Sequence, residues 1–413
     1  MNNFHYQTNE LYCENISLTQ IAQEVGTPTY VYSLAEIKER ANSYQQTGSS
    51  ERKTVCYAVK ANQNPRILEI LRDAGLGADV TSGGELFLAL HAGIAPEKII
   101  YSGVGKRRDE INMALDANIR ALHVESAMEL DVIAEIASER QQIVRIGVRV
   151  NPNISVETHP YMSTGETLHK FGVTPETAVS LLHTAREHPY LQPVAVAAHI
   201  GSQITDIVPF AASAQFLTNM AEELASSGIH LNYIDVGGGL GIDYQSPTSS
   251  PQIVDWVTAV STPVHQAGFD IVMEPGRSII APTGMLLTQV EYLKIQGKKP
   301  FLIVDAGMND LLRPTLYKAY HPIMRVQQSE ADLIDYDIVG PICETGDTFA
   351  QKRQLPATKA GDLLAIGQAG AYGYAMSSNY NGRLRPAEVL VDGDQYTIIR
   401  QRQSYEHLLD GIS

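Results

Sequence analysis

Between Thr54 and Arg277 the sequence repeats one pattern eight times: a short apolar, β-branched run that ends in polar residues or glycine, followed by a segment with helical spacing. The runs are TVCYAV, ADVTS, IIYSGV, ALHVES, RIGVRV, VAVAAHIGS, YIDVGGG and IVMEPGR. Strands that alternate with helices pair in parallel, and eight such units fit a closed, TIM-like (β/α)8 barrel better than an open sheet. The chemistry of such a barrel lies at the C-terminal ends of its strands, where this sequence has Lys60, Asp79, His199, Gly237–Gly239 and Glu274–Arg277.

The segments between these runs carry helix signals. In Pro65–Ala74 the apolar residues share one face, Asn64 can cap the first turn, and Gly75 ends the pattern. Ser126 and Glu129 have the spacing of a capping box. These signals predict helices that cross over between the parallel strands.

After about Ala281 the rhythm changes to strand-like runs without intervening helices. We therefore expect two domains: a barrel over 33–280, and an all-β domain of Greek-key barrel or sandwich type over 281–413. The N-terminal segment 1–32 is expected to complete the β domain.

Charge and cysteine content exclude several classes of protein. Acidic residues outnumber basic ones by 46 to 31, for a net charge of -15, so the surface would repel a nucleic acid. Cys13, Cys56 and Cys343 are too few and too far apart for a disulfide framework, which indicates a reducing compartment. The sequence shows no signal peptide and no apolar run of membrane-spanning length, and a cytoplasmic protein is expected.

Lys60 follows the apolar Tyr57-Ala58-Val59 and precedes Ala61-Asn62. An ammonium on the inner side of a strand would lose water, which lowers its pKa from ~10.4 toward that of a reactive amine. The alternative is a strand-end lysine that extends to solvent, and an isolated motif of this kind favours that alternative.

Further candidate groups follow the later strands. Gly237–Gly241 offers bare backbone amides to a phosphate, or is simply a tight turn. Glu274 and Arg277 offer a carboxylate and a guanidinium to a ligand, or form a surface pair. His199 is either a catalytic ring or a packed one.

Cys343 lies in a polar Gly/Pro-rich loop, where a thiol acts as an acid or nucleophile or is a small apolar residue. The sequence has no HExxH, paired CxxC or EF-hand spacing, so no metal is assigned.

Six motifs, YAVKAN, HIGSQ, GGGLG, EPGRS, GPICETGD and AGAYG, occur in this order over most of the chain. With the expected barrel and β domain, they resemble the alanine-racemase-like, fold type III pyridoxal phosphate-dependent decarboxylases. The resemblance implies a carboxy-lyase that uses pyridoxal 5'-phosphate.

The same resemblance implies roles for the site residues. Lys60 would form the Schiff base with the cofactor, His199 would stack on its ring, and Glu274 would hold the pyridine nitrogen, where a carboxylate stabilises the pyridinium. The other implied cofactor-binding residues, several of them around the phosphate, are Asp79, Ser202, Gly238, Gly239, Gly276, Arg277 and Tyr372. Cys343 would reprotonate Cα from the β domain of a partner subunit, which implies a homodimer with shared active sites.

For the substrate, the resemblance implies that Arg277, Arg313 and Tyr317, with Tyr372 nearby, bind a distal carboxylate, and that Glu344 binds a distal ammonium. Lysine or ornithine would leave the arginines unpaired, at a cost of roughly 3 to 5 kcal/mol. The expected reaction is the decarboxylation of meso-2,6-diaminopimelate to L-lysine, the last step of lysine biosynthesis.

Two alternatives stay open: a decarboxylase of another diamino acid, of ornithine, lysine or carboxynorspermidine type, and a non-catalytic relative that binds pyridoxal phosphate to regulate. The chain also departs from the family pattern in two places. The expected lid, His159–Gly172, reads Ser163-Thr164-Gly165-Glu166-Thr167-Leu168-His169 before Lys170-Phe171-Gly172, where many relatives have Lys-Glu-Asn, and Asp305 is followed by Ala306-Gly307 in place of a second alanine.

Overall fold

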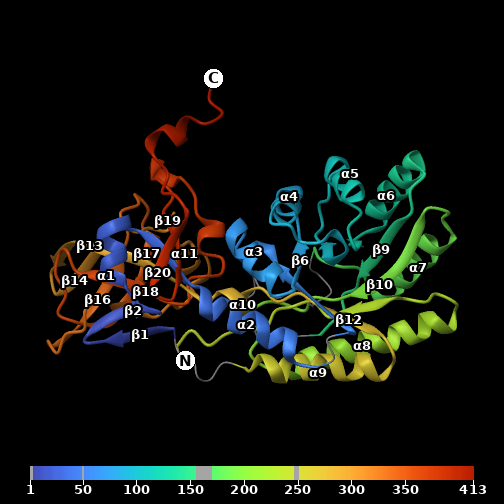
Figure 1. The fold of residues 1–413 in the computed structure, drawn as a ribbon, viewed down its shortest axis with the longest axis horizontal. Helices are drawn as coiled ribbons and strands as arrows, with labels where there is room; N and C mark the ends of the chain where they lie inside the picture. The colour runs from blue at the N-terminus through green and yellow to red at the C-terminus, as the bar shows by residue number, and fades with distance from the viewer. Residues whose placement is uncertain (1–2, 49–50, 155–169, 246–250) are drawn as a thin grey trace. The chain divides into compact units, whose positions relative to one another are not determined.

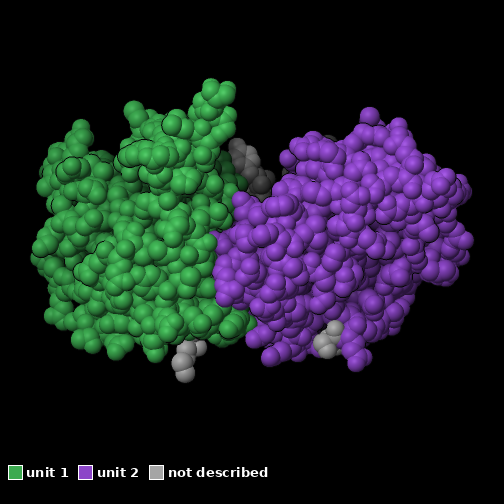
Figure 2. All heavy atoms as spheres, turned by 45° about the horizontal axis from the view of Figure 1, so that its top comes forward, with its two compact units in different colours: residues 1–39, 244–247, 279–413 green, residues 40–243, 248–278 purple. Residues whose placement is uncertain are grey.

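The structure is a computed structural model that describes residues 3–48, 51–154, 170–245 and 251–413. The chain forms two compact units, coloured separately in Figure 2: a barrel unit of residues 40–243 and 248–278, and a β unit of residues 1–39, 244–247 and 279–413. The limits expected for independently folding domains, 33–280 and 281–413 with 1–32, stay a prediction. No helix within the described ranges is long and apolar enough to span a membrane.

The barrel unit contains all eight predicted strands. They are β5 (Lys53–Ala58), β6 (Gly77–Val80), β7 (Ile99–Tyr101), β8 (Ala121–Val124), β9 (Val144–Arg149), β10 (Leu191–Ala197), β11 (Tyr233–Asp235) and β12 (Asp270–Met273). Every neighbouring pair is parallel, and the pairing of β12 with β5 and of β9 with β10 closes the barrel. The predicted barrel architecture is confirmed.

Helices connect these strands, as Figure 1 shows. They are α3 (Pro65–Asp73), α4 (Gly83–His91), α5 (Arg108–Ala117), α6 (Ala127–Arg140), α7 (Pro175–Glu187), α8 (Val208–Ser226) and α9 (Ile253–Gln266), with α2 (Leu34–Gln46) before β5. Between β6 and β7 and after β12 lie the short helices η2 (Pro96–Lys98) and α10 (Arg277–Ile280).

The predicted caps are largely correct. Asn64 accepts a hydrogen bond from the Arg66 amide at the start of α3, and Ser126 accepts one from the Glu129 amide at the start of α6. The second half of the predicted capping box differs, because the Glu129 carboxylate accepts the amide of Glu125 rather than that of Ser126. The Glu129 side chain therefore reaches one residue further back along the chain than in a capping box, and its hydrogen bond links the end of β8 to α6.

The β unit is built on a nine-stranded sheet that draws on both ends of the chain. Its strands are β4 (Thr29–Ser33), β13 (Gly284–Gln296), β14 (Lys299–Val304), β15 (Ile323–Arg325), β16 (Leu333–Val339), β17 (Thr348–Pro356), β18 (Leu363–Ile366), β19 (Ala387–Asp392) and β20 (Gln395–Arg400). The strand β4 pairs antiparallel with β13 and parallel with β19. The predicted β fold is confirmed.

Two strands within residues 281–413 were not predicted. The strand β17 reads TFAQKRQLP, and most of its side chains are exposed or half-buried, so it shows no apolar face. It is held by antiparallel pairing with β16. The strand β15 has only three residues and lies after α11 (Arg313–Tyr317). Backbone pairing, rather than side-chain pattern, defines both.

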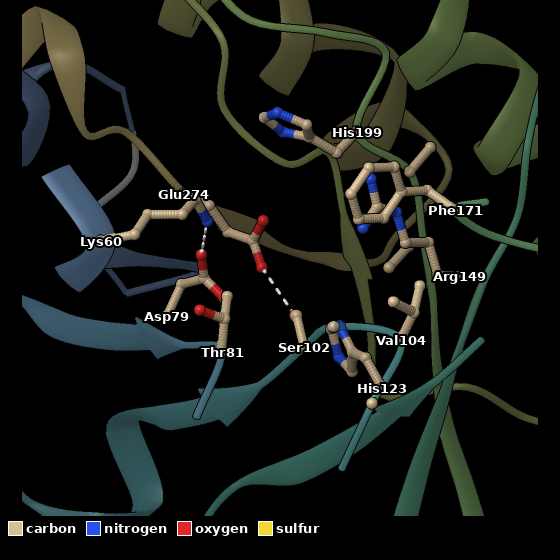
Figure 3. A pocket seen from close by; sticks show the side chains of 14 residues that line it. Lys60, Asp79, Thr81, Ser102, Val104, His123, Arg149, Phe171, His199 and Glu274 are labelled. Atoms are coloured by element: carbon tan, nitrogen blue, oxygen red, sulfur yellow. Dashed lines mark hydrogen bonds and ion pairs between the residues drawn. The ribbon is translucent and has the colours of Figure 1, made fainter. Parts of the chain in front are cut away.

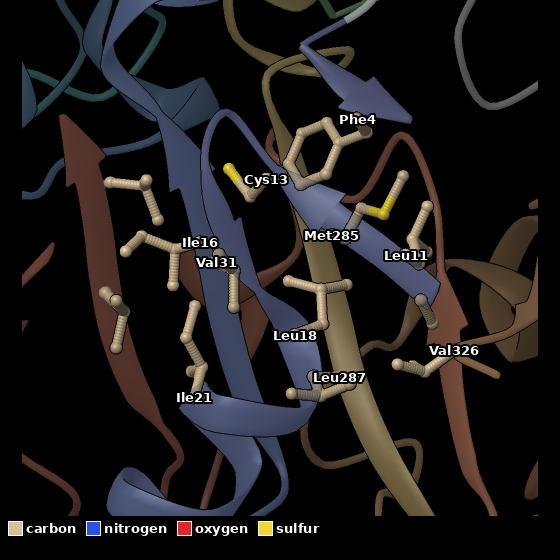
Figure 4. Packing of buried hydrophobic residues seen from close by; sticks show 13 residues of the cluster. Phe4, Leu11, Cys13, Ile16, Leu18, Ile21, Val31, Met285, Leu287 and Val326 are labelled. Atoms are coloured by element: carbon tan, nitrogen blue, oxygen red, sulfur yellow. The ribbon is translucent and has the colours of Figure 1, made fainter. Parts of the chain in front are cut away.

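The N-terminal segment also forms a small sheet, β1 (Phe4–Gln7), β2 (Glu10–Cys13) and β3 (Ile16–Ser17), followed by α1 (Leu18–Val25). Ser17 caps α1 through its side chain. Apolar side chains of this segment pack against the nine-stranded sheet (Figure 4), among them Phe4, Leu11, Ile16, Leu18 and Ile21 against Val31, Met285, Leu287 and Val326. The segment thus supplies part of the core of the β unit.

We predict that Leu18→Ala lowers the free energy of unfolding by about 2 to 5 kcal/mol, because the Leu18 side chain is fully buried and its removal leaves a cavity. The measurement is urea unfolding followed by far-ultraviolet circular dichroism. Leu333→Ala is the matched control in the same unit, since Leu333 is 64% exposed, and it should change the midpoint little. Equal midpoints for the two variants would contradict the packing role of α1.

Candidate active site

Lys60 lies in η1 (Val59–Ala61), a short 3-10 turn directly after β5. Its Nζ is 2.6 Å from Oδ2 of Asp79, which is fully buried in the neighbouring strand β6. The pairing register sets this contact, because Ala58 at the end of β5 lies opposite Asp79. Of the two interpretations left open by the sequence, a desolvated amine and a side chain that extends to solvent, the structure is nearer the second, since the Lys60 side chain is 37% exposed and has a carboxylate partner.

A cavity of about 370 Å³ opens beside Lys60, at the C-terminal ends of the barrel strands (Figure 3). It is lined by Lys60, Asp79, Thr81, Ser102, Gly103, Val104, Gly105, His123, Arg149, Phe171, Ala197, Ala198, His199 and Glu274. This volume lies in the range of small-molecule sites. Four residues singled out from the sequence, Lys60, Asp79, His199 and Glu274, therefore share one cavity.

Glu274 follows β12 and is 8% exposed. Burial, together with the nearby carboxylates of Asp235 and Asp79, raises the pKa of Glu274 well above its usual value. The Ser102 hydroxyl donates to Oε1 of Glu274 at 3.5 Å, the dashed contact in Figure 3. Glu274 is therefore a carboxyl group that retains a proton easily and points at the cavity.

His199 follows β10, and its Nδ1 accepts the backbone N–H of Gly238 at 3.2 Å. Its proton must then reside on Nε2 when the ring is neutral. Burial lowers the pKa of His199 well below its usual value, and the charges of Arg149 and Lys60 add to this effect. The site thus holds a neutral, flat ring with fixed orientation.

The glycine-rich turn after β11 has a packing explanation. A Cβ on Gly238 would lie 2.0 Å from the carbonyl oxygen of Glu274, and one on Gly239 would lie 2.0 Å from that of Gly201. Only glycine allows the segments after β10, β11 and β12 to approach so closely. A Cβ on Gly276 would lie 3.0 Å from that of Ala58. The phosphate-binding role of these glycines stays a prediction.

Arg277 lies near this turn and is 6% exposed. Its Nη2 donates to the hydroxyl of Ser202 at 3.1 Å. The structure therefore brings together two polar residues that the sequence analysis placed with the cofactor.

Sequence reasoning missed several residues of the cavity. Arg149 ends β9, pairs with Glu125 at 3.0 Å and lies over the ring of Phe171. Ser102 and His123 also line the cavity from the ends of β7 and β8. Their position at strand ends was a usable signal, because barrel chemistry gathers there.

Five candidate residues belong to the β unit and are described within it. Arg313 begins α11 and is 2% exposed; its Nη1 is 2.8 Å from Nε2 of His321, and its guanidinium lies over the ring of Tyr244. Tyr317 ends the same helix and is half-buried. A buried arginine held by two rings is a rigid cation.

The other three candidates of the β unit lie in loops. The Cys343 thiol is exposed, and its backbone amide donates to Oδ1 of Asn381 at 2.7 Å. Glu344 is also exposed, and Tyr372 has a left-handed backbone with φ of 56°. An exposed thiol next to an exposed carboxylate is open to another molecule.

The expected lid, His159–Gly172, lies mostly outside the described residues. At its end, the Gly172 amide donates to Oε2 of Glu125 at 2.9 Å, and Phe171 lines the cavity. Phe171 therefore lies in the cavity wall and Gly172 directly follows it.

Comparisons with known proteins agree with this geometry. The family model for the pyridoxal binding domain of pyridoxal-dependent decarboxylases matches residues 34–281. The chain is 45% identical to diaminopimelate decarboxylase of Aquifex aeolicus, over 98% of this chain and 96% of that protein. It is 44% identical to that of Pseudomonas aeruginosa, over 100% and 99%.

Solved structures give the same result. Diaminopimelate decarboxylase of Helicobacter pylori complexed with L-lysine superposes with a TM-score of 0.91 at 42% identity, covering 95% of this chain and 98% of that one. The M. jannaschii structure in co-complex with L-lysine gives 0.95 at 35% identity, over 100% and 99%.

We predict that His123 makes the barrel less stable in acid. Burial lowers the pKa of His123 to about 3, so below pH 6.5 the unfolded chain binds a proton that the folded protein does not, and stability is lost as the pH falls. Between pH 7 and 5 the wild type should lose about 2 kcal/mol more than His123→Asn.

The measurement is urea unfolding at each pH, followed by the fluorescence of Trp256, the single tryptophan, which is buried in α9. His230→Asn, at an exposed position, serves as the control and should keep the wild-type pH dependence. If His123→Asn also kept it, His123 would not be held neutral.

Proposed function

The chain belongs to the pyridoxal-dependent decarboxylases, and from that premise we propose that it converts meso-2,6-diaminopimelate to L-lysine and carbon dioxide, the last step of lysine biosynthesis. The family, the enzyme class and the cofactor expected from the six motifs are confirmed. The choice of substrate rests on full-length similarity to diaminopimelate decarboxylases. A lysine, a neutral histidine and a buried glutamic acid around one cavity agree with it.

The residues of the cavity fit pyridoxal phosphate. The Oδ1 atom of Asp79 is buried and makes no hydrogen bond within the part of the chain that the structure describes, and the carboxyl of Glu274 has only the long contact to Ser102. Both await a polar partner inside the cavity. Lys60, which lies beside Asp79, would be the amine that holds the cofactor through its aldehyde.

When bound, pyridoxal phosphate supplies the electron sink for the pair of electrons left at Cα by departing carbon dioxide. Asp79 orients Lys60, and His199 presents a neutral face to the ring. Glu274 would hold the ring nitrogen, where a carboxylate stabilises the pyridinium. Ser202, Gly238, Gly276 and Tyr372 would lie around the phosphate, and Gly239 and Arg277 are further proposed cofactor contacts.

Two buried arginines select the substrate in our proposal. Arg277 and Arg313 are 6% and 2% exposed, so each is largely removed from water. With Tyr317 and Tyr372 they bind the distal carboxylate, while Glu344 binds the distal ammonium. A substrate without that carboxylate would lack a charge-assisted hydrogen bond to each arginine, and each such bond is worth roughly 1.5 to 3 kcal/mol.

The test is carbon dioxide release across a panel of amino acids. We expect meso-diaminopimelate to be turned over with kcat/KM at least a hundredfold above that for lysine or ornithine, consistent with roughly 3 kcal/mol or more of lost binding. Arg313→Gln should reduce this preference, and Lys318→Gln, a surface change on the residue after α11, is the matched control.

A preference for ornithine, lysine or carboxynorspermidine would favour the alternative decarboxylases. Release from none of them, with the cofactor bound, would favour a regulatory protein.

Cys343 is the proposed acid that protonates Cα after carbon dioxide leaves. Its loop is exposed and polar, which supports contact with a second molecule of this chain. We therefore propose a homodimer in which Cys343 and Glu344 of each subunit complete the site of the other.

Subunit complementation tests this sharing. Lys60→Ala and Cys343→Ala should each be nearly inactive alone. Mixed after dissociation, they should regain about a quarter of the wild-type activity, because half of the dimers are mixed and each of these has one intact site.

Lys60→Ala mixed with Lys60→Arg is the control and should stay inactive. No recovery in the first mixture, with mixed dimers shown to form by native mass spectrometry, would place both residues in one subunit.

We also propose a cytoplasmic location. Cys13, Cys56 and Cys343 are all free thiols, which supports a reducing compartment.

A further inference from the structure

Asp235 and Glu274 form a pair of buried carboxyl groups, and Glu274 lines the cavity. Asp235 ends β11 and is fully buried, and Glu274 follows the adjacent strand β12. One oxygen of each lies within 4.8 Å of the other and of a His123 ring nitrogen.

The pair has no cation of its own. Among the residues that the structure describes, no lysine or arginine nitrogen lies within 4 Å of either carboxyl. Lys60 is in contact with Asp79, and Arg149 with Glu125. Two adjacent carboxylates in such a site repel each other and are poorly solvated, so one proton between them is strongly favoured.

His123 cannot supply the missing charge. Its Nε2 is 3.1 Å from the Tyr233 hydroxyl, and its Nδ1 is 3.7 Å from Oδ2 of Asp235. The ring is packed against Gly147, where a Cβ would lie 2.4 Å away. Burial keeps this histidine neutral. Its ring therefore packs beside the two carboxyl groups without contributing a positive charge.

Asp235 is the better-held member when it is ionised. Its Oδ1 accepts the Gly237 amide at 2.9 Å, and Nδ1 of His123 lies 3.7 Å from its Oδ2. Among the described residues, Glu274 has the Ser102 hydroxyl alone as a hydrogen-bond donor, and it faces the cavity. The negative charge therefore belongs on Asp235 and the proton on Glu274, at the position nearest a ligand.

We propose that Asp235 is a positioning residue that keeps Glu274 protonated until pyridoxal phosphate enters, so that the proton on the ring nitrogen comes from this pair and not from solvent. The inference rests on the proposed contact of Glu274 with that nitrogen. In the step, the O–H bond of Glu274 breaks and an N–H bond to the ring forms. The electron pair of that O–H bond stays on Glu274, no group is oxidised, and the total charge is unchanged.

The charge of the pair responds to all groups that face it. These are Asp79 and Lys60 at the ends of β6 and β5, Arg149 from β9, Arg120 and His123 near β8, Cys56 from β5 and Tyr233 from β11. None of the variants below changes the charge of any of these neighbours.

The test counts protons taken up when full-length protein, freed of cofactor, binds pyridoxal phosphate. Titration calorimetry in two buffers of different ionisation enthalpy gives this number, in mildly alkaline solution where the free ring nitrogen is mostly unprotonated. The reference ligand is the analogue in which the ring nitrogen is replaced by C–H, because it reacts at Lys60 but takes no ring proton. The difference between the two ligands isolates the proton on nitrogen.

We expect a difference of zero for the wild type and about one proton per site for Asp235→Asn, which removes the neighbouring negative charge and so leaves Glu274 ionised beforehand. Ser102→Ala removes a neighbour of Glu274 that does not titrate, and should give zero. Equal uptake by the wild type and Asp235→Asn would overturn the proposal.

The variant Glu274→Gln tests separately the proposed contact between Glu274 and the ring nitrogen, on which the shared proton depends. The wild type should bind pyridoxal phosphate roughly tenfold or more tightly than the analogue, and Glu274→Gln should lose that preference. If it kept the preference, the contact between Glu274 and the ring nitrogen would be wrong. If Glu274→Gln lost the preference while Asp235→Asn took up no extra proton, the contact with the ring nitrogen would stand. The proposal that Asp235 keeps Glu274 protonated would then be wrong.

An infrared measurement needs no variant and covers the case in which Asp235→Asn fails to fold. Binding of pyridoxal phosphate to the wild type should remove the carbonyl band of a buried carboxylic acid, and binding of the analogue should leave it. An unchanged band with both ligands would overturn the proposal.

Discussion

Charge balance at one end of the barrel is the constraint on which the site depends. Parallel pairing brings Asp79, Asp235 and Glu274 to the same end, and all three are buried. The ammonium of Lys60 contacts Asp79. The remaining two carboxyl groups are stable together only with a proton between them or a ligand that brings positive charge. The cofactor that this family binds has a ring nitrogen that can hold a positive charge. Such a charge would balance the negative charge of the two carboxyl groups.

The sequence was informative where function depends on contiguous residues. Eight apolar runs with intervening helix signals sufficed for the barrel, and strand ends led to Lys60, Asp79, His199 and Glu274. The roles of Arg149 and His123 depend on packing across different strands, with Phe171 and Gly147, and such contacts have no signature in a single sequence. The strand β17 was not predicted for a related reason. It has no apolar face, and its hydrogen bonds to β16 hold it in the sheet.

Lys60 shows that apolar neighbours in sequence do not decide how far a side chain is exposed. The sequence left open a desolvated amine or a side chain that extends to solvent, and the turn η1 carries the side chain to a partly exposed place beside Asp79. The glycine-rich turn also allowed two interpretations, a phosphate site and a tight turn. Its glycines are required for backbone approach between neighbouring strand ends, which is a constraint that holds with or without a phosphate.

The pairing of β4 with both β13 and β19 has a consequence for how the protein is made. Thr29 lies opposite Ala387, so the last partner of an early strand leaves the ribosome only after the whole barrel has been synthesised. The barrel strands, which pair with close sequence neighbours apart from the closing pair, can fold first. During that interval β4 and the apolar face of α1 lack their sheet, and the N-terminal segment must stay out of competing strand pairs until β19 has been made. The sheet of the β unit can therefore be completed only after the barrel has been synthesised.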